Sequence, residues 1–365
     1  MKKRQDLLGR VGSRIGSAVD DAILGALSRR FSAGRPRVRA PKVEPLEHGD
    51  RRALLAEAIA FYRRPEILSG ERFFLAPERP RVVTERRGAL PQGGELVDLK
   101  WESAFVPAWE RVREDYQSHA PNRDAYVRLL RQNRAAPTIV CLHGYRGGAF
   151  VLEERAFPTR WLYSLGLNVV LFQLPFHGHR GGPGAPVWPS VNVARANEGF
   201  AHAIYDLRAL RRWLDEVSGR QPLAVCGMSL GGYTTALLAT VEKLDLAVPM
   251  IPVASFPDLL WDHGAGRPER ARAEREGITV EMLRQAMEVH TPLSRVPLVP
   301  PERVLVVSAE GDRIAPPEHA ARLARHFGAE ELRFVGGHVL QLGRRAAFSA
   351  LARRLAKAGL IPERS

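Results

Sequence analysis

Apolar and polar residues alternate along this chain with two different periods. From Thr138 onward, short apolar runs rich in Val, Leu and Ile are separated by longer stretches with helical spacing. The predicted strands are 138–142, 168–174, 223–227, 246–253, 303–308 and 332–335, and the predicted helices include 194–217, 317–327 and 344–358. Such alternation is typical of right-handed βαβ crossovers and of a parallel sheet buried on both faces. The sequence therefore predicts an α/β protein with a doubly wound, mostly parallel sheet.

The leading third of the chain has a different pattern. Residues 5–31 place apolar side chains at helical spacing, and residues 34–49 hold three prolines, as is typical of a linker. Further helices are predicted at 52–64 and 106–116, and strands at 73–75, 81–84, 95–101 and 126–130. We therefore divide the chain into a basic amphipathic helix with its linker at 1–50 and a main domain at 51–365.

The connection from about residue 256 to residue 301 is too long for a simple crossover between strands. It contains apolar residues at helical spacing, among them Leu259, Leu260, Met282 and Leu283. Long insertions in compact domains often cover a site. We predict a helical cap at about 256–301.

Composition and charge restrict the class of protein. Apolar residues make up 45% of the chain and charged residues 26%, an ordinary balance for a globular protein. The net charge is +14, and the first 53 residues hold thirteen Lys and Arg against six Asp and Glu. Because half of the excess lies there and no nucleic-acid-binding motif accompanies it, we expect a basic tail and no nucleic-acid partner.

Two cysteines, Cys141 and Cys226, both lie in apolar runs. We expect buried thiols and a reducing compartment. No apolar run reaches the roughly 18 residues of a membrane span, and charged residues interrupt the N-terminal stretch where a secretory signal would stand. Cytoplasmic localisation is therefore expected. For residues 5–31 two interpretations are open, a helix packed against protein and a basic helix in peripheral contact with a membrane surface. The oligomeric state is left open.

The run from Leu223 to Tyr233 has the form of a strand, a tight turn and a helix. Its G-x-S-x-G segment, Gly227 to Gly231, places Ser229 at the tip of the turn. Such a turn holds a serine in strained backbone angles with its hydroxyl clear of the sheet. Glycines are needed on both sides because helix and strand cross closely there. Ser229 is the candidate nucleophile.

Serine needs a base that takes its proton. Asp312 follows the predicted strand 303–308, and His338 follows the next one, 332–335. Both should therefore lie at the sheet edge that carries Ser229. We predict His338 as general base and then general acid, and Asp312 as the carboxylate that orients it. Glu310 is the rival acid and ranks lower, because Asp312 sits at the crest of the loop.

The glycine-rich run His143 to Gly148 follows the strand 138–142. Backbone amides in such a turn can bind a developing oxyanion. We assign this role to the amides of Tyr145 and Leu230. A phosphate-cradling loop is the alternative, but no G-K-[ST] follows. Pocket residues assigned to substrate binding are His143, Gly144, His177 and Trp261.

These motifs together resemble the α/β-hydrolase superfamily. The resemblance rests on H-G at 143–144, G-M-S-L-G at 227–231, G-D-R-I-A-P at 311–316 and G-G-H at 336–338 and covers about residues 120–360. It implies a Ser229–Asp312–His338 triad and a mostly parallel sheet of about eight strands with a cap. Gln173 departs from the family, because many members carry an acidic residue near this place.

His177-Gly178-His179 also invites a metal hypothesis. Metallo-hydrolases built on H-x-H usually continue with an acidic residue and a further histidine, whereas Arg180 follows here. We expect no metal and no cofactor, and His177 and His179 should line the pocket mouth or bond to loop backbone.

Four functions are consistent with these residues. The first is a cofactor-independent serine hydrolase that cleaves an ester or thioester of a small-molecule acyl substrate through an acyl-enzyme on Ser229. Acyl transfer or peptide cleavage would use the same triad. A binding or scaffold protein on a hydrolase fold, without turnover, is the alternative from a different class.

Overall fold

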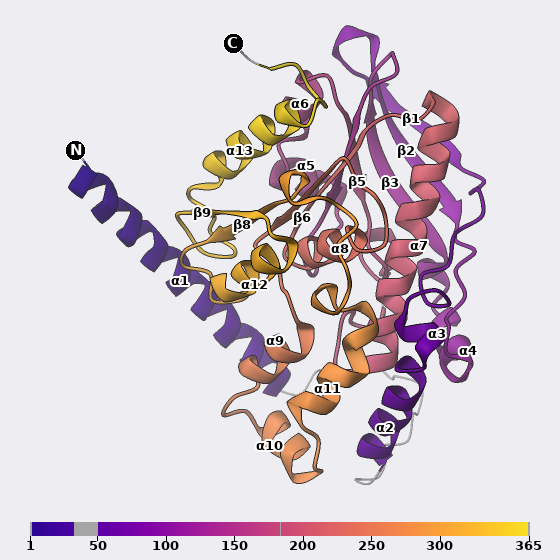
Figure 1. The fold of residues 1–365 in the computed structure, drawn as a ribbon, viewed down its shortest axis with the longest axis vertical. Coiled ribbons are helices and arrows are strands. Elements are labelled where there is room, and N and C mark those ends of the chain that lie inside the picture. The colour runs from indigo at the N-terminus through magenta and orange to yellow at the C-terminus, as the bar shows by residue number, and fades with distance from the viewer. Residues whose placement is uncertain (1, 33–49, 183, 364–365) are drawn as a thin grey trace.

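The computed structural model describes the backbone of residues 2–32, 50–182 and 184–363, and the side chains of residues 9–24, 51–182 and 184–363. Within these ranges nine strands form one sheet in the order β1-β2-β3-β5-β4-β6-β7-β8-β9 (Figure 1). The strands are β1 (Val83–Ala89), β2 (Glu95–Glu102), β3 (Asp124–Arg131), β4 (Thr138–Leu142), β5 (Asn168–Phe172), β6 (Leu223–Met228), β7 (Leu246–Met250), β8 (Leu305–Ala309) and β9 (Glu330–Phe334).

The first four strands of this order pair antiparallel, and the strands from β5 to β9 pair in parallel. The predicted doubly wound, mostly parallel sheet is confirmed. It has nine described strands where the resemblance implied about eight.

Burial along the strands explains their sequences. Every residue of the five central parallel strands, β4 to β8, is buried, as expected for a sheet covered on both faces. Alternate residues of each strand join one of two apolar clusters: Val140 and Leu142 face one side, and Ile139 and Cys141 face the other. The edge strand β1 is almost wholly exposed and carries Glu85, Arg86 and Arg87, charges that oppose edge-to-edge pairing.

Helices cover both faces of the sheet. The helices are α1 (Lys2–Ser32), α2 (Asp50–Tyr62), α3 (Pro65–Leu68), α4 (Arg113–Gln117), α5 (Phe150–Ala156), α6 (Thr159–Ser164), α7 (Val193–Ser218), α8 (Leu230–Leu238), α9 (Phe256–His263), α10 (Pro268–Arg275), α11 (Val280–Met287), α12 (Pro317–Phe327) and α13 (Arg344–Lys357). Residues of α5, α6 and α13 belong to one cluster, and residues of α2, α7, α8, α11 and α12 belong to the other. Cys141 and Cys226 are free and buried, as predicted.

Two predicted elements are wrong. Residues 73–75 form a turn and coil instead of a strand. Phe73 and Phe74 are buried, and this burial accounts for apolar residues at these positions. The ring of Phe73 packs edge-on against Tyr62 with 5.9 Å between centroids. The predicted helix at 106–116 is reduced to a 3-10 turn at Glu110–Val112 and the short α4. By contrast, the stretch from Phe256 onward is helical, with α9, α10 and α11 in succession.

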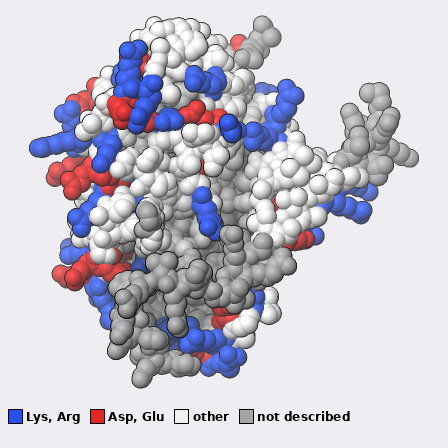
Figure 2. Space-filling view, turned by 180° about the vertical axis from the view of Figure 1, so that it is seen from behind, with Lys and Arg blue, Asp and Glu red and all other residues white. Residues whose placement is uncertain are grey.

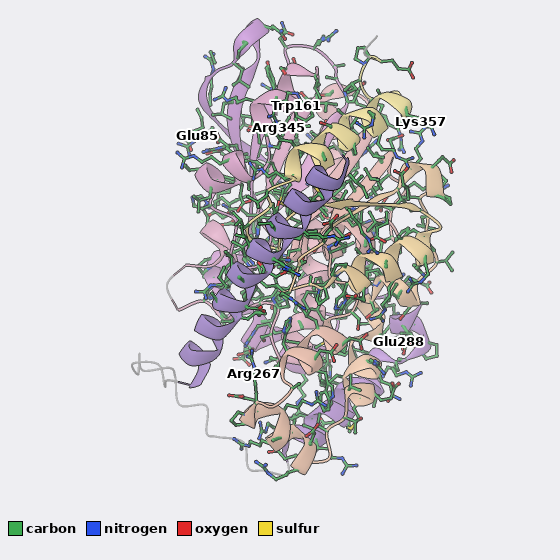
Figure 3. All side chains as sticks on the ribbon, turned by 90° about the vertical axis from the view of Figure 1, so that its left-hand side faces the viewer. Glu85, Trp161, Arg267, Glu288, Arg345 and Lys357 are labelled. Atoms are coloured by element: carbon green, nitrogen blue, oxygen red, sulfur yellow. The ribbon has the colours of Figure 1, made fainter. Side chains whose placement is uncertain are left out.

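The N-terminal helix α1 covers the predicted stretch 5–31 and runs obliquely across one side of the molecule (Figures 1 and 3). Its described side chains pack against the loops that follow β8 and β9, so the structure favours a helix packed against protein. The predicted linker at 34–49 lies outside the described residues.

The described surface carries charges of both signs. On the face shown in Figure 2, basic side chains stand among acidic ones and are not gathered into one basic field. Helices long and apolar enough to cross a bilayer are not found in the described part of the chain.

Candidate active site

Ser229 stands between β6 and α8 with backbone angles φ 56° and ψ −112°. A positive φ is strained for a residue with a side chain, at a cost of about 1–3 kcal/mol. The surrounding backbone holds this conformation. The Ser229 amide donates to the Met250 carbonyl at 2.9 Å. A Cβ added at Gly227 would lie 2.1 Å from the Gly231 carbonyl oxygen, so helix and strand cross as closely as the motif predicts.

Asp312 and His338 follow β8 and β9 and are joined by a hydrogen bond. His338 Nδ1 lies 2.7 Å from Asp312 Oδ2, and their side chains are 10% and 1% exposed. The other carboxylate oxygen, Oδ1, accepts from the amides of Ile314 and Ala315 at 2.9 and 2.7 Å. The carboxylate therefore has a fixed orientation. It holds a proton on Nδ1 of the imidazole and leaves Nε2 as the acceptor.

Glu310, the rival acid, has a different partner. Its Oε2 accepts from the Ser13 hydroxyl of α1 at 2.9 Å. Asp312 is the carboxylate that pairs with His338.

The order β6-β7-β8-β9 brings Ser229, Asp312 and His338 to the same edge of the sheet. Among the described side chains, the Ser229 hydroxyl makes no hydrogen bond to His338. Contacts of this kind are often long in free enzymes and tighten when substrate binds. The structure thus brings the candidate acid Asp312 and the candidate base His338 into direct contact, and it places Ser229, the candidate nucleophile, at the same edge.

The loop after β4 lies against Ser229. A Cβ added at Gly144 would lie 3.5 Å from Ser229 Cβ. His143 Nδ1 donates to the Gly144 carbonyl at 2.8 Å, and its Nε2 accepts from the Leu174 amide at 3.0 Å. Burial lowers the pKa of His143 to about 3, so the ring is neutral and braces the loop.

The two amides assigned to the oxyanion differ in their settings. Leu230 is the first residue of α8, where a backbone N–H has no acceptor within its own helix. Tyr145 lies in the loop after β4, and its side chain is 40% exposed. Leu230 follows Ser229 directly and Tyr145 follows Gly144, which lies close to Ser229, and the role of both amides stays a prediction.

Two buried side chains brace the same loop. Glu153 of α5 accepts from the Gly148 amide at 2.8 Å, and burial raises the pKa of this carboxyl. Gln173 donates to the Gly148 carbonyl at 2.6 Å and accepts from the His179 amide at 3.0 Å. A carboxylate at position 173 would have no N–H to donate to the Gly148 carbonyl. Gln173, which departs from the family pattern here, therefore makes a hydrogen bond that an acidic residue could not make. Sequence reasoning missed Glu153, whose only signal was a charge near the start of a helix next to the loop.

The remaining candidates make separate contacts. His177 Nδ1 donates to the Pro175 carbonyl at 2.8 Å, and burial lowers its pKa to about 4. His179 Nδ1 lies 3.0 Å from Gln173 Nε2 and 3.2 Å from Gln173 Oε1, so both histidines bond within their loop. Trp261 of α9 is partly exposed, and the guanidinium carbon of Arg270 lies over its ring, 4.6 Å from the centroid of that ring.

In the ranges with described side chains, no three His, Cys, Asp or Glu residues gather as metal ligands would.

Comparisons with known proteins agree with this fold. A family model described as "Alpha/beta hydrolase domain containing 18" matches residues 120–259. The chain is similar to the uncharacterized protein Rv2627c of Mycobacterium tuberculosis (strain ATCC 25618 / H37Rv), with 31% identity over 291 residues that cover 78% of this chain and 70% of the relative. The uncharacterized protein MT2702 of the strain CDC 1551 / Oshkosh matches with the same identity and coverage.

Two solved structures share the fold. Acetyl xylan esterase 1 from Thermoanaerobacterium sp. JW/SL YS485 superposes with a TM-score of 0.53 at 16% identity and covers 86% of this chain and 94% of its own. Acetyl xylan esterase from Paenibacillus sp. R4 gives a TM-score of 0.53 at 15% identity, covering 90% of this chain and 98% of its own. At these identities the likeness concerns the architecture of the sheet and its helices.

Proposed function

The chain belongs to the α/β-hydrolase superfamily, and on that premise we propose that it is a cofactor-independent serine hydrolase that cleaves carboxylic esters or thioesters. The observation that carries this proposal is the strained Ser229 at the tip of its turn, at the same sheet edge as a hydrogen-bonded His338–Asp312 pair. A pair so oriented has the geometry of a general base with its supporting carboxylate. Membership of the superfamily supports hydrolysis in general. The arrangement of Ser229, His338 and Asp312 supports a serine nucleophile.

The proposed reaction has two steps. Ser229 Oγ attacks the carbonyl carbon while His338 Nε2 takes the hydroxyl proton, and the carbonyl electron pair moves to the oxyanion. The amides of Tyr145 and Leu230 bind that oxyanion. When the tetrahedral species collapses, the bond to the leaving oxygen or sulfur breaks and the imidazolium protonates it. Water then repeats the sequence on the acyl-enzyme and releases the carboxylic acid.

The cap supports an apolar acyl portion. Partly buried Leu259, Leu260, Met282 and Leu283 extend the main apolar cluster into α9 and α11. Apolar side chains of this kind contribute roughly 25 cal/mol per Å² of apolar surface that they cover. We therefore expect activity to rise with acyl length over the shorter esters.

A panel of esters with graded acyl length tests the proposal. We expect the wild type to hydrolyse members of the panel and Ser229→Ala to lose this activity. Ser164→Ala is the matched control, because Ser164 is an exposed serine on α6. Equal rates in the wild type and Ser229→Ala, above the uncatalysed rate, would reject Ser229 as the nucleophile.

A specific observation favours a second candidate, a binding protein on a hydrolase fold without turnover. That observation is the lack of a hydrogen bond between the described side chains of Ser229 and His338. The same panel decides between the two candidates. A wild-type protein that hydrolyses none of the esters supports the binding protein.

A further inference from the structure

The face of α1 that contacts the main domain is built from small and polar residues. Gly12, Gly16 and Asp20, spaced four apart, are buried, whereas Val11 and Ile15 are 46% and 49% exposed. An amphipathic helix ordinarily buries its apolar stripe. The contact surface of α1 is therefore specialised for something other than apolar packing.

Asp20 is fully buried, and its carboxylate bridges the two loops that carry Asp312 and His338. Its Oδ2 accepts from the amides of Arg313 at 3.1 Å and His338 at 2.7 Å, and its Oδ1 accepts from the amide of Val339 at 3.1 Å. One carboxylate thus binds the residue after the acid, the histidine itself and the residue after the histidine. Buried carboxylates are costly unless they are hydrogen-bonded in this way.

The neighbouring turns of α1 contact the same loops through backbone. Ser17 Oγ donates to the Gly311 carbonyl at 2.7 Å. A Cβ added at Gly16 would lie 2.2 Å from the Gly337 nitrogen, and one added at Gly311 would lie 2.2 Å from the Ser13 carbonyl oxygen. Because these are backbone atoms, no side-chain movement can make room. The glycines allow α1 to approach closely enough for Asp20 to reach its three donors.

We infer that α1 is an intramolecular positioning element for the catalytic loops, and that Asp20 is a positioning residue that sets the place of His338. The inference rests on the function proposed above. Without the carboxylate, three loop amides lose their acceptor. His338 can then shift relative to Asp312 and Ser229. A displacement of about 1 Å at a reacting group is sufficient to lower a rate by roughly 100-fold.

Asp20→Asn tests this inference against Asp21→Asn, its exposed neighbour on the same helix. The asparagine keeps the size of the side chain, but one of its two terminal atoms becomes a donor that faces loop amides. We expect kcat for the best ester of the panel to fall roughly 10- to 100-fold. KM should remain within about twofold, because no substrate contact is removed. Asp21→Asn should keep the wild-type kcat and KM.

Two glycine variants test the close approach independently. Gly16→Ala places its methyl group 2.2 Å from the Gly337 nitrogen, whereas Gly9→Ala meets only Val335 Cγ2 at 3.5 Å, an ordinary contact. We expect Gly16→Ala to lower kcat in the same way as Asp20→Asn, and Gly9→Ala to leave it unchanged.

The outcomes separate this inference from the proposed function. A wild-type protein that turns over esters while Asp20→Asn matches Asp21→Asn in kcat overturns the inference and leaves the hydrolase intact. A wild-type protein without turnover overturns both. If Asp20→Asn does not fold, Ser17→Ala decides, because it removes the hydroxyl that bonds Gly311 on the loop and otherwise only a bond within α1, to the Ser13 carbonyl. A several-fold lower kcat at unchanged KM supports the inference, and wild-type kcat overturns it.

Discussion

Ser229 and His338 stand at the same edge of the sheet, but different parts of the chain hold them. Ser229 is held by its immediate neighbours in sequence and by buried strands, through backbone crossings at Gly227 and Gly231. His338 is held by Asp312 and by Asp20, which lies 318 residues away along the chain. Ser229 therefore has a local support within the core, whereas His338 is also bonded to a helix that packs on the outside of the domain.

This difference means that the two sides of the site can be damaged separately. Changes at the turn around Ser229 should affect the core and the chemistry together. Changes at α1 should affect the chemistry through His338 and leave the core largely unaltered. The following predictions test that contrast, from the largest expected effect to the smallest.

Removing either Ser229 or His338, the proposed proton donor and acceptor, should lower the rate of ester hydrolysis by the same large factor. We expect Ser229→Ala and His338→Ala each to lower kcat for ester hydrolysis by about 10⁴-fold or more, and the double variant to lower it no further, because the residues act as a unit. Steady-state kinetics on the three variants check this. An additive double variant, or His338→Ala with a tenth of the wild-type rate, would contradict the proposed roles.

The turn around Ser229 should tolerate an added methyl group far less well than α1 does. A Cβ at Gly231 would lie 2.0 Å from the Leu142 carbonyl oxygen, inside the core. We expect Gly231→Ala to lower the free energy of unfolding by about 3 kcal/mol, as overpacking does. Gly16→Ala should lower the free energy of unfolding by less than half of that amount. Urea unfolding of both variants measures the difference. Equal losses would show that α1 is as integral to the core as the turn.

The free energy of unfolding should fall as the pH is lowered, because the histidines in the loops near Ser229 are buried and neutral. Burial lowers the pKa of His143 to about 3 and of His177 to about 4. In the unfolded chain each takes up a proton below about pH 6.5, so their stabilisation is present above that pH and is lost as pH falls. From pH 7.5 to 5.5 the loss is about 1.4 kcal/mol for each histidine.

His177→Asn isolates this contribution. Burial raises the pKa of Glu153 and Glu198, and these carboxyls act in the opposite direction, so the comparison of wild type and variant matters more than the total. Urea unfolding at both pH values should show a fall that is smaller by about 1.4 kcal/mol in His177→Asn. An identical fall in both proteins would mean that His177 does not remain neutral in the folded state.

The smallest effect is expected on the outer face of α1. We propose that exposed Val11 and Ile15, next to Arg10 and Arg14, give peripheral contact with anionic membranes. Vesicle flotation should show weaker partitioning for the Val11→Ser/Ile15→Ser double variant than for the wild type, by roughly 1 kcal/mol or less. Equal partitioning rejects the membrane contact, and the docking of α1 through Asp20 would be unaffected.

The core of this fold was predictable because its strands leave a clear periodic signal. Runs such as 138–142 and 223–227 are buried on both faces, so their apolar residues mark the strands directly. The Ser229 turn was predictable because closely crossing backbones require glycine at fixed spacing. Asp312 was ranked above Glu310 from its place in the loop, and the structure pairs it with His338.

Other features left no such signal. Phe73 and Phe74 of the apolar run at 73–75 are buried in a turn, which periodicity cannot distinguish from a strand. The contact face of α1 was not predictable, because Gly12, Gly16 and Asp20 are the positions that an amphipathic pattern treats as polar or neutral. Only the fold reveals that Asp20 meets loops more than 290 residues away in sequence.

Labelling with a fluorophosphonate probe tests the central claim most directly, because the probe reacts with serines that a neighbouring base activates. We predict a single adduct that peptide mapping places on Ser229 in the wild type, with none in Ser229→Ala and strongly slowed labelling in His338→Ala. A folded wild-type protein that remains unlabelled, or an adduct on a serine other than Ser229, would contradict the account.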